Sequence, residues 1–387
     1  MAKNVKIGTH DGVFHCDEAL ACFILKTLPR YKDAVIVRSR DMNILDECDI
    51  VIDVGKEYNP SKHRYDHHMR HFNESVSTVI KKPGYDWTMQ LSSAGLIYCH
   101  FGHEFIKHLI PQANDSDVEL IFKYIYDTFI KEIDGIDNGV PMFKDEPKYY
   151  IVTDLSSRVK FLNPAWNSKD INIDSQFLKA VELTGQELVQ HVNYAANVWL
   201  PARSIVQEAI DKRFEVDPSG EIIELSQCVP WSQHLHAIEK EQNIEPPLQY
   251  VIFGSHNKYR VQGIPVRPNS FVCRLFLPEP WGGLRDEKLV SVSGIKDAVF
   301  WQSEIFNSFC GRISVRCKMS YLRSNNFRMS SFRLRDLRCI DDTAIGAYGR
   351  TRCRSECVPG RLVRLSREVR CFRLCHFRRV QNVAVVG

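Results

Sequence analysis

No stretch of the chain is apolar for long enough to cross a membrane. A membrane-spanning helix needs about 18 or more consecutive apolar residues, and none of the apolar runs in this 387-residue sequence approaches that length. The first ten residues, MAKNVKIGTH, lead at once into an apolar stretch and leave no room for a signal or transit peptide. We therefore expect no membrane partner and a location in the nucleus and cytoplasm, with a mitochondrial location left open.

The sequence also lacks a disulfide framework. Its 13 cysteines are odd in number, and those of the first 300 residues stand in apolar contexts without the regular spacing of a cross-linked scaffold. This usage is typical of a reducing compartment, where thiols serve as small hydrophobic groups.

Lysine almost disappears after residue 310. Residues 311–387 contain seventeen Arg, one Lys and five acidic residues, a net charge of +13, so the first 310 residues carry −9 of the overall +4. An acidic main body argues against a broad electrostatic grip on nucleic acid.

The composition therefore marks residues 304–387 as a basic Arg/Cys-rich tail, in which no steady helical or strand period occurs. We interpret it as a disordered segment from a shifted reading frame or an altered splice. One alternative is an Arg-rich RNA-binding arm. The other is a zinc site, although its spacing is loose for zinc ligands. Its ligands would be Cys353, Cys357, Cys371, Cys375 and His376.

What the sequence does contain is an alternation of short strands and helices. Runs rich in β-branched residues at 5–9, 34–39 and 48–54 are typical of buried strands, and 18–28 is typical of a helix that is apolar nearly all round. The alternation predicts an α/β fold with a doubly wound, mostly parallel sheet over residues 1–175.

A second, smaller α/β domain is predicted over residues 215–303. We expect this domain to be incomplete. A long helical pattern interrupted by Pro201 predicts a kinked helical connector over 176–214. The strands and the helix predicted for the second domain are 222–225, 249–253, 258–262 and 231–240.

Four polar residues with metal-ligand chemistry stand between the first predicted strand and the first predicted helix: His10, Asp11, His15 and Asp17. This junction lies at the carboxyl edge of the predicted sheet, where ligands of open α/β sheets bind. Imidazoles and carboxylates this close together would repel one another or bury unpaired charge without a cation among them. A polar turn with Asp17 as a helix cap is the alternative interpretation.

Two further clusters of candidate ligands follow along the chain. Asp53 closes a Val/Ile-rich run, and Asp66, His67 and His68 follow in HRYDHHMRHF. Adjacent side chains point in different directions, so we expect one histidine to bind metal and the other to face substrate. Asp66 would orient an imidazole or join the ligand shell.

The last acidic candidates follow an apolar helical pattern at 118–133. Asp134 and Asp137 occur in DGIDNG, where a glycine turn without function is the alternative. We favour Asp137 as the ligand, with Asp134 close behind. Basic residues that could contact substrate phosphates lie in a loop-like stretch at 153–167 and in the second domain: Arg158, Lys160, Arg260, Arg267 and Arg274.

Taken together, these clusters resemble the four motifs of the DHH phosphoesterase superfamily. The segments THDGVFHCDEALA, VIDVGKEYNP, RYDHHMRHF, LSSAGLIY and GLRDE are similar, more narrowly, to the eukaryotic family of the melanocyte-proliferating-gene-one exonuclease. The resemblance covers about residues 4–300. Gly282 departs from it, because the family usually has Arg there, and the sequence after Phe300 departs from it entirely.

The resemblance implies a DHH catalytic domain joined to a smaller substrate-binding domain, and two divalent cations, Mn²⁺ or Mg²⁺. It implies hydrolysis of RNA from the 3′ end in the nucleus and mitochondria. The residues that it makes ligands are His10, His15, Asp17, Asp53 as the bridge, His67, and Asp134 or Asp137. His68 would face the scissile phosphate, and we count Asp11 and Asp66 with it as catalytic candidates.

The chemistry also follows from the residues themselves. Phosphodiester hydrolysis requires charge neutralisation and a hydroxide near neutral pH, and two ions about 3.5–4 Å apart supply both. A mixed set of histidine and carboxylate ligands is more typical of an Mn²⁺ site than of a zinc site, which commonly has thiolate ligands. We expect a 3′–5′ RNA exonuclease acting on RNA or a short single-stranded oligonucleotide. The alternatives are a phosphoesterase for oligonucleotide fragments, cyclic dinucleotides or pyrophosphate, and a catalytically impaired RNA-binding protein.

Overall fold

The computed structural model describes residues 5–169, 171–255, 258–295, 298–302 and 312–315. The alternative zinc site and nearly all of the predicted 304–387 tail lie outside the described residues. Among the described residues, no helix combines the length and the apolar character that crossing a membrane requires.

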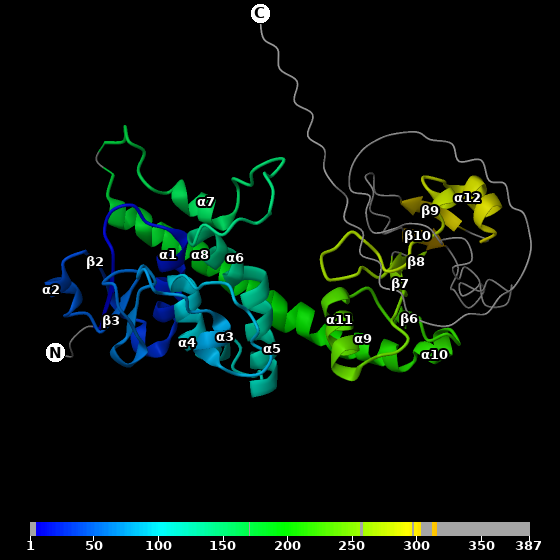
Figure 1. The fold of residues 1–387 in the computed structure, drawn as a ribbon, viewed down its shortest axis with the longest axis horizontal. Helices are drawn as coiled ribbons and strands as arrows, with labels where there is room; N and C mark the ends of the chain where they lie inside the picture. The colour runs from blue at the N-terminus through cyan, green and yellow to red at the C-terminus, as the bar shows by residue number, and fades with distance from the viewer. Residues whose placement is uncertain (1–4, 170, 256–257, 296–297, 303–311, 316–387) are drawn as a thin grey trace, which may run out of the picture. The chain divides into compact units, whose positions relative to one another are not determined.

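The first sheet has five strands in the order β2-β1-β3-β5-β4 (Figure 1). They are β1 (Lys6–Thr9), β2 (Val35–Arg38), β3 (Ile50–Ile52), β4 (Tyr58–Asn59) and β5 (Arg64–Tyr65). The pairs β1–β2, β1–β3 and β3–β5 are parallel, and only β4 pairs with its neighbour in the antiparallel sense. The predicted α/β fold with a mostly parallel sheet is confirmed.

The two faces of this sheet pack against different layers. Ile7 and Ile52 point into the large core that contains α1 (Cys16–Thr27) and α4 (Ser93–Leu109). Val51, between two core-facing isoleucines, packs on the other face with Leu45 of the short helix α2 (Met42–Leu45). This alternation follows from the period-2 geometry of a strand. The N-termini of α1 and α4 lie at the carboxyl edge of the sheet.

The remaining helices of this part complete the large core. Gly185 of α8 packs so closely against α1 that a Cβ there would overlap the ring of Phe23. The helix predicted at 118–133 is present, with a π-helical turn between two α-helical parts. The helices and turns are η1 (Pro29–Tyr31), η2 (Pro60–Lys62), α3 (Val76–Ile80), α5 (Asp115–Ile125), η3 (Tyr126–Ile130), α6 (Lys131–Asp137), α7 (Leu155–Lys160) and α8 (Ile173–Tyr194).

The predicted kink at Pro201 takes the form of a π-helical turn just before the proline. Helix α8 passes through η4 (Ala195–Trp199) into α9 (Leu200–Asp211), and Pro201 lies in the first turn of α9. Proline has no N–H to donate to the preceding turn, so the helical hydrogen bonds must rearrange there. A short helix, α10 (Arg213–Val216), follows.

The second sheet has the order β6-β7-β8-β10-β9, with β6 and β7 parallel and the other pairs antiparallel. Strand β10 belongs to this sheet although it lies beyond the predicted boundary at residue 303. The elements are β6 (Ile222–Leu225), α11 (Ser232–Gln242), β7 (Tyr250–Ser255), β8 (Lys258–Gly263), η5 (Glu279–Trp281), α12 (Asp286–Ser293), β9 (Ala298–Gln302) and β10 (Arg312–Val315).

Candidate metal centre

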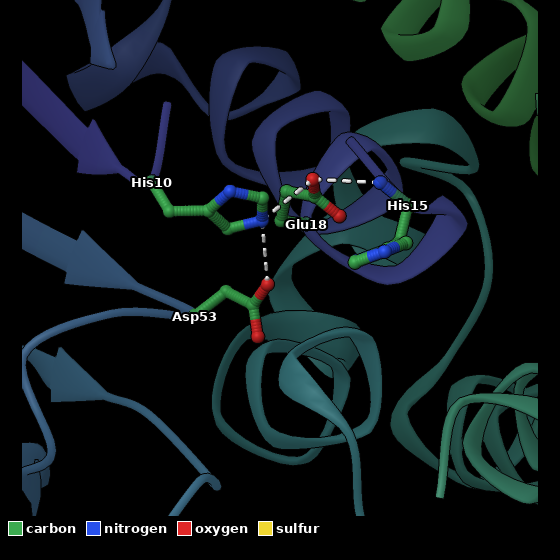
Figure 2. Close-up of side chains that lie close together, drawn as sticks. All are labelled: His10, His15, Glu18 and Asp53. Carbon is green, nitrogen blue, oxygen red and sulfur yellow. Dashed lines mark hydrogen bonds and ion pairs between the residues drawn. The ribbon is translucent and has the colours of Figure 1, made fainter. Parts of the chain in front are cut away.

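His10 directly follows β1, and its buried ring joins two carboxylates (Figure 2). Its Nε2 lies 3.0 Å from Glu18 Oε1 and 3.2 Å from Asp53 Oδ2. Asp53 follows β3, the strand beside β1, so the parallel pairing brings the two strand ends together. Together with His15, these residues place one ligand atom each within 4.8 Å of one another.

Glu18 is a member of this cluster that the sequence-based prediction missed. Its side chain is fully buried on the first turn of α1, and its Oε1 accepts a hydrogen bond from the His15 backbone N at 2.8 Å. This is the reciprocal contact of a capping box, in which an acidic residue stands three positions after the cap. The spacing of His15 and Glu18 was the available signal.

A second cluster shares Asp53 with the first. Asp53 Oδ1 lies 3.2 Å from His67 Nε2 and 3.6 Å from His68 Nδ1, and the three residues form a second group with ligand spacing. Asp66 is buried and accepts hydrogen bonds from the backbone N and the Nδ1 of His68, at 3.1 Å and 2.8 Å. Asp66 therefore fixes the orientation of the half-exposed His68 ring.

Asp17 and Asp137 close the cluster from two helices. Asp137 ends α6, and its Oδ2 lies 3.3 Å from His67 Nε2, while Asp17 Oδ2 lies 3.8 Å from the same atom. His15, Asp17 and Asp137 form a third group whose ligand atoms lie within 4.8 Å of one another. Among the predicted ligands, the structure thus brings together residues that are 127 positions apart in the chain.

The N-terminus of α4 supports the two central carboxylates. The backbone N of Ser93 donates to Asp17 Oδ2 at 3.2 Å, and its hydroxyl donates to Asp53 Oδ1 at 2.9 Å. The positive end of a helix dipole favours nearby negative charge. The two carboxylates lie 76 and 40 residues away from Ser93 in the chain, so only the fold brings them to this helix end.

Protonation equilibria at the cluster indicate an excess of negative charge. Burial raises the pKa of Glu18 to about 8, and burial together with the Asp17 charge raises the pKa of Asp137 to about 9. Burial acts to lower the pKa of His10, but its hydrogen bonds with Asp53 and Glu18 dominate and raise it to about 10. The carboxylates therefore favour any positive charge placed among them.

Two buried oxygen atoms test whether the residues fit a cation. Among the described residues, neither Asp17 Oδ1 nor Glu18 Oε2 has a hydrogen-bond partner, although both are shielded from solvent. A buried carboxylate oxygen without a partner is costly. Imidazole nitrogen and carboxylate oxygen are donors that divalent transition metals accept. The donor chemistry fits one or two divalent cations, and Asp53 belongs to two of the groups that would hold them.

Asp53 has a strained backbone conformation. Its φ angle is 61°, in the left-handed region that residues with a Cβ rarely adopt, and Gly55 follows at 101°. Such a conformation costs of order 1 kcal/mol or more and persists where the surroundings enforce it. The sharp turn after β3 is what aims the carboxylate at His10 and His67.

Asp134 and Asp11 lie apart from these groups. The Asp134 carboxylate is fully buried and accepts hydrogen bonds from the Ser92 backbone N and hydroxyl and from the Tyr126 hydroxyl, at 2.9, 2.8 and 3.2 Å. Asp11 is exposed, and its Oδ1 lies 3.2 Å from Arg40 Nε. Asp137 is therefore the better placed of the two alternative ligands, and Asp11 lies at the rim.

The basic residues predicted to contact substrate differ in whether their side chains are paired within the protein. Arg274 is committed to the second sheet's own packing, because its guanidinium donates to both oxygens of Glu239 at 2.8 Å and 2.7 Å. Arg158 donates to Glu187 and lies on α7, where a loop was expected from the sequence. Of the remaining candidates, Lys160 and Arg267 are exposed and Arg260 is half-buried.

The fold and the cluster define an α/β protein with a buried histidine–carboxylate centre at the carboxyl edge of a parallel sheet. The model of the family described as "Uncharacterised protein family (UPF0160)", MYG1_exonuc, matches residues 6–320. The chain belongs to this family, and the resemblance noted from its motifs is confirmed.

Relatives with this architecture are similar over most of their length. The chain is 48% identical over 300 residues to the MYG1 exonuclease of Rattus norvegicus, covering 76% of this chain and 78% of that protein. It is 48% identical over 301 residues to the MYG1 exonuclease of Homo sapiens, covering 76% and 79%. The MYG1 protein of Dictyostelium discoideum is 41% identical over 313 residues, covering 80% and 92%.

Among solved structures, RecJ from Thermus thermophilus in complex with Mn²⁺ is similar at 11% identity. The match covers 82% of this chain and 50% of that one, with a TM-score of 0.23. A TM-score of this size does not establish a common fold.

Proposed function

We propose that this protein is a metal-dependent nuclease that hydrolyses phosphodiesters and, more narrowly, a 3′–5′ exoribonuclease. The observation that carries the proposal is the pair of ligand groups that share Asp53, at a sheet edge with unpartnered buried carboxylate oxygens. The relatives named MYG1 exonuclease, at 48% identity, support the nuclease class.

The ligand residues divide into two sets around Asp53. One cation would be held by His10, Glu18 and Asp53, with His15 at the exposed side, and a second by Asp53, His67 and Asp137. Two such ions supply charge neutralisation and a nucleophile near neutral pH for hydrolysis of a phosphodiester. The mixed donor set favours Mn²⁺, with Mg²⁺ as the alternative.

His68 is the residue best placed to contact the substrate. Its Nδ1 donates to Asp66, so Nε2 of its half-exposed ring is left to face a ligand. The hydrogen bond with Asp66 raises the pKa of His68, which favours a charged ring that can donate to a phosphate oxygen. Asp66 acts through His68 and is a positioning residue.

A labelled RNA tests the proposal. Purified protein in Mn²⁺ should shorten a 5′-labelled single-stranded RNA stepwise from its 3′ end, and a 3′-terminal block should slow the first step. Asp53→Asn should lower turnover by more than about a hundredfold, because it removes the shared ligand. Asp11→Asn, at the rim, is the matched control and should retain most of the activity.

The other outcomes select the alternatives. Cleavage of dinucleotides without cleavage of longer RNA would indicate a small-molecule phosphoesterase. RNA binding without any cleavage in Mn²⁺ or Mg²⁺ would indicate an RNA-binding protein.

A further inference from the structure

Two aromatic rings on the segment between α6 and α8 are almost completely exposed. Phe161 is 80% exposed and Trp166 is 96% exposed. Single exposed apolar side chains are common, but large aromatic side chains gain most from burial, and an open tryptophan on an ordered segment is unusual.

The backbone that carries these rings is fixed. Asp154 caps α7 by accepting a hydrogen bond from the Ser157 N at 2.8 Å, and Leu155 and Val159 are buried in the large core. Arg158 ties α7 to Glu187 of α8. The exposure of the rings therefore does not come from a segment that lacks packing.

The backbone that carries Trp166 is fixed by a turn and by the side chain of Asn163, which we call the Asn163 clamp. The Ser168 N donates to the Ala165 O at 2.9 Å, which closes a turn with Trp166 at its second position. Asn163, between the two rings, donates from Nδ2 to the Phe14 O at 2.8 Å and accepts from the Phe14 N at 3.0 Å.

This clamp connects the rings to the candidate metal centre. Phe14 directly precedes His15 in the loop between β1 and α1, which supplies His10 and His15 and leads into Asp17 on the first turn of α1. Phe161 and Trp166 are two and three positions from Asn163, so their backbones lie within about 10 Å of a residue hydrogen-bonded to that loop.

The charge of the chain determines which substrate feature such rings could recognise. The first 310 residues carry a net charge of −9, so extended binding of phosphates by basic side chains is disfavoured there. Stacking of unpaired bases on aromatic rings contributes to single-strand binding without basic residues and tolerates any base. Lys160, next to Phe161 and exposed, can add one phosphate contact.

The geometry points to Phe161 and Trp166 as a base-stacking surface for single-stranded RNA, positioned beside the metal centre by the Asn163 clamp. The inference rests on the proposed function for the identity of the substrate. Asn163 is a positioning residue in this arrangement, since it holds the ring-bearing segment against the ligand loop.

Equilibrium binding tests the surface without turnover. In the full chain carrying Asp53→Asn, fluorescence anisotropy is measured with a labelled ten-nucleotide oligoadenylate and with an abasic oligonucleotide of the same length. Phe161→Ala and Trp166→Ala should each weaken oligoadenylate binding about tenfold, and Trp166→Phe should restore most of the loss. Binding of the abasic oligonucleotide should be the same for all variants, because it offers no base to stack.

Phe143→Ala is the matched control, since Phe143 is 58% exposed on the same connecting segment but precedes α7. An unchanged oligoadenylate affinity, an equal loss on the abasic oligonucleotide, or an equal loss in the control would overturn the inference. A change of oligomeric state on gel filtration with unchanged RNA affinity would also overturn it, and would indicate that the rings contact a second copy.

Activity of the chain with an unsubstituted Asp53 separates this inference from the proposed function. If RNA is cleaved and the ring variants bind as the parent does, the stacking surface is wrong and the exonuclease proposal stands. If RNA is bound through the two rings but never cleaved, the surface stands and the exonuclease proposal fails.

Discussion

Asp134 and Asp137, three residues apart on one helix, have opposite surroundings. Asp134 is the buried acceptor for three hydrogen bonds from Ser92 and Tyr126, and Asp137 faces His67. Asp134→Ala should lower the free energy of unfolding by about 2–4 kcal/mol, because it leaves buried donors without a partner. Asp137→Ala should cost little stability but should lower Mn²⁺ affinity at least about tenfold.

Urea unfolding and calorimetric Mn²⁺ titration of the two variants measure these effects. Equal loss of Mn²⁺ affinity in a correctly folded Asp134→Ala protein would contradict the assignment of Asp137 as the ligand.

At the scale of single residues, the sequence allowed candidate metal ligands to be named. It did not allow the hydrogen-bond and ion-pair partners of those side chains to be predicted. His10 and Asp53 were recognisable because each follows a predicted strand, and His67 because it stands in a run rich in histidine. Glu18 was hidden, because a glutamate at the start of a helix has an ordinary role as a cap. For Arg274, proposed to contact substrate, nothing in the sequence indicated its partner Glu239, which is 35 residues away.

The crossing of α1 and α8 depends on a glycine. A Cβ at Gly185 would overlap the ring of Phe23, so Gly185→Ala should destabilise the protein by about 1–3 kcal/mol through overpacking. Gly135 in α6 is the control, because the nearest atom to a Cβ there is Met89 Cε at 3.7 Å. Gly135→Ala should raise stability by about 0.5–1 kcal/mol through the better helix propensity of alanine. Thermal melts of both variants measure the contrast, and equal melting temperatures would contradict it.

Helices α4 and α5 are linked by a contact that depends on pH. Burial acts to raise the pKa of Glu119, but hydrogen bonds from Tyr85, His103 and Lys123 dominate and lower it to about 2. A carboxyl whose pKa is lowered on folding contributes stability above its unfolded value near 4.5, and that stability is lost as the pH falls toward 2.

The stability difference between the parent and Glu119→Gln should therefore be constant above about pH 5 and shrink between pH 4.5 and 2. Urea midpoints across this range measure it. A difference that stays constant down to pH 2 would show that Glu119 is not ion-paired in the folded state.

At the scale of elements, the strands and helices predicted from hydrophobic period are present, whereas short elements such as β4, β5 and α7 were not predicted. Residues 153–167 were expected to form a loop, yet α7 forms within them. Asp154 caps it with Ser157 three residues later, and only Leu155 and Val159 are buried. A helix of 6 residues has too few apolar positions to show a period.

For the whole molecule, the separation of charge predicts how RNA binding depends on salt. A chain shortened to residues 1–320 should show a slope of log affinity against log salt of about −2 or shallower, because the net charge of −9 on the first 310 residues disfavours extended binding of phosphates. Binding of a single-stranded RNA between 50 and 300 mM salt measures the slope. A steep slope in the shortened chain would contradict the stacking mode.

The full chain provides the comparison. The difference in slope between the full chain and the shortened chain measures how many phosphates residues 321–387 neutralise. Equal slopes would contradict the interpretation of the basic segment as an RNA-binding arm. Composition made this segment recognisable as different. Composition did not predict strand β10, which pairs with residues 10 to 17 positions away in β9 and 50 to 56 positions away in β8.

The left-handed backbone at Asp53 has a consequence for anyone seeking an inactive form of this protein. Glycine adopts that conformation without strain, so Asp53→Gly should remove the shared ligand and at the same time relax the turn after β3. The same change leaves the Ser93 hydroxyl, His10 and His67 without their buried acceptor. Asp53→Gly should therefore lose stability, but less than Asp53→Ala, which keeps the strained backbone as well. Glycine is therefore a better choice than alanine for a reference protein without the shared carboxylate, and thermal melts of the two variants measure the difference.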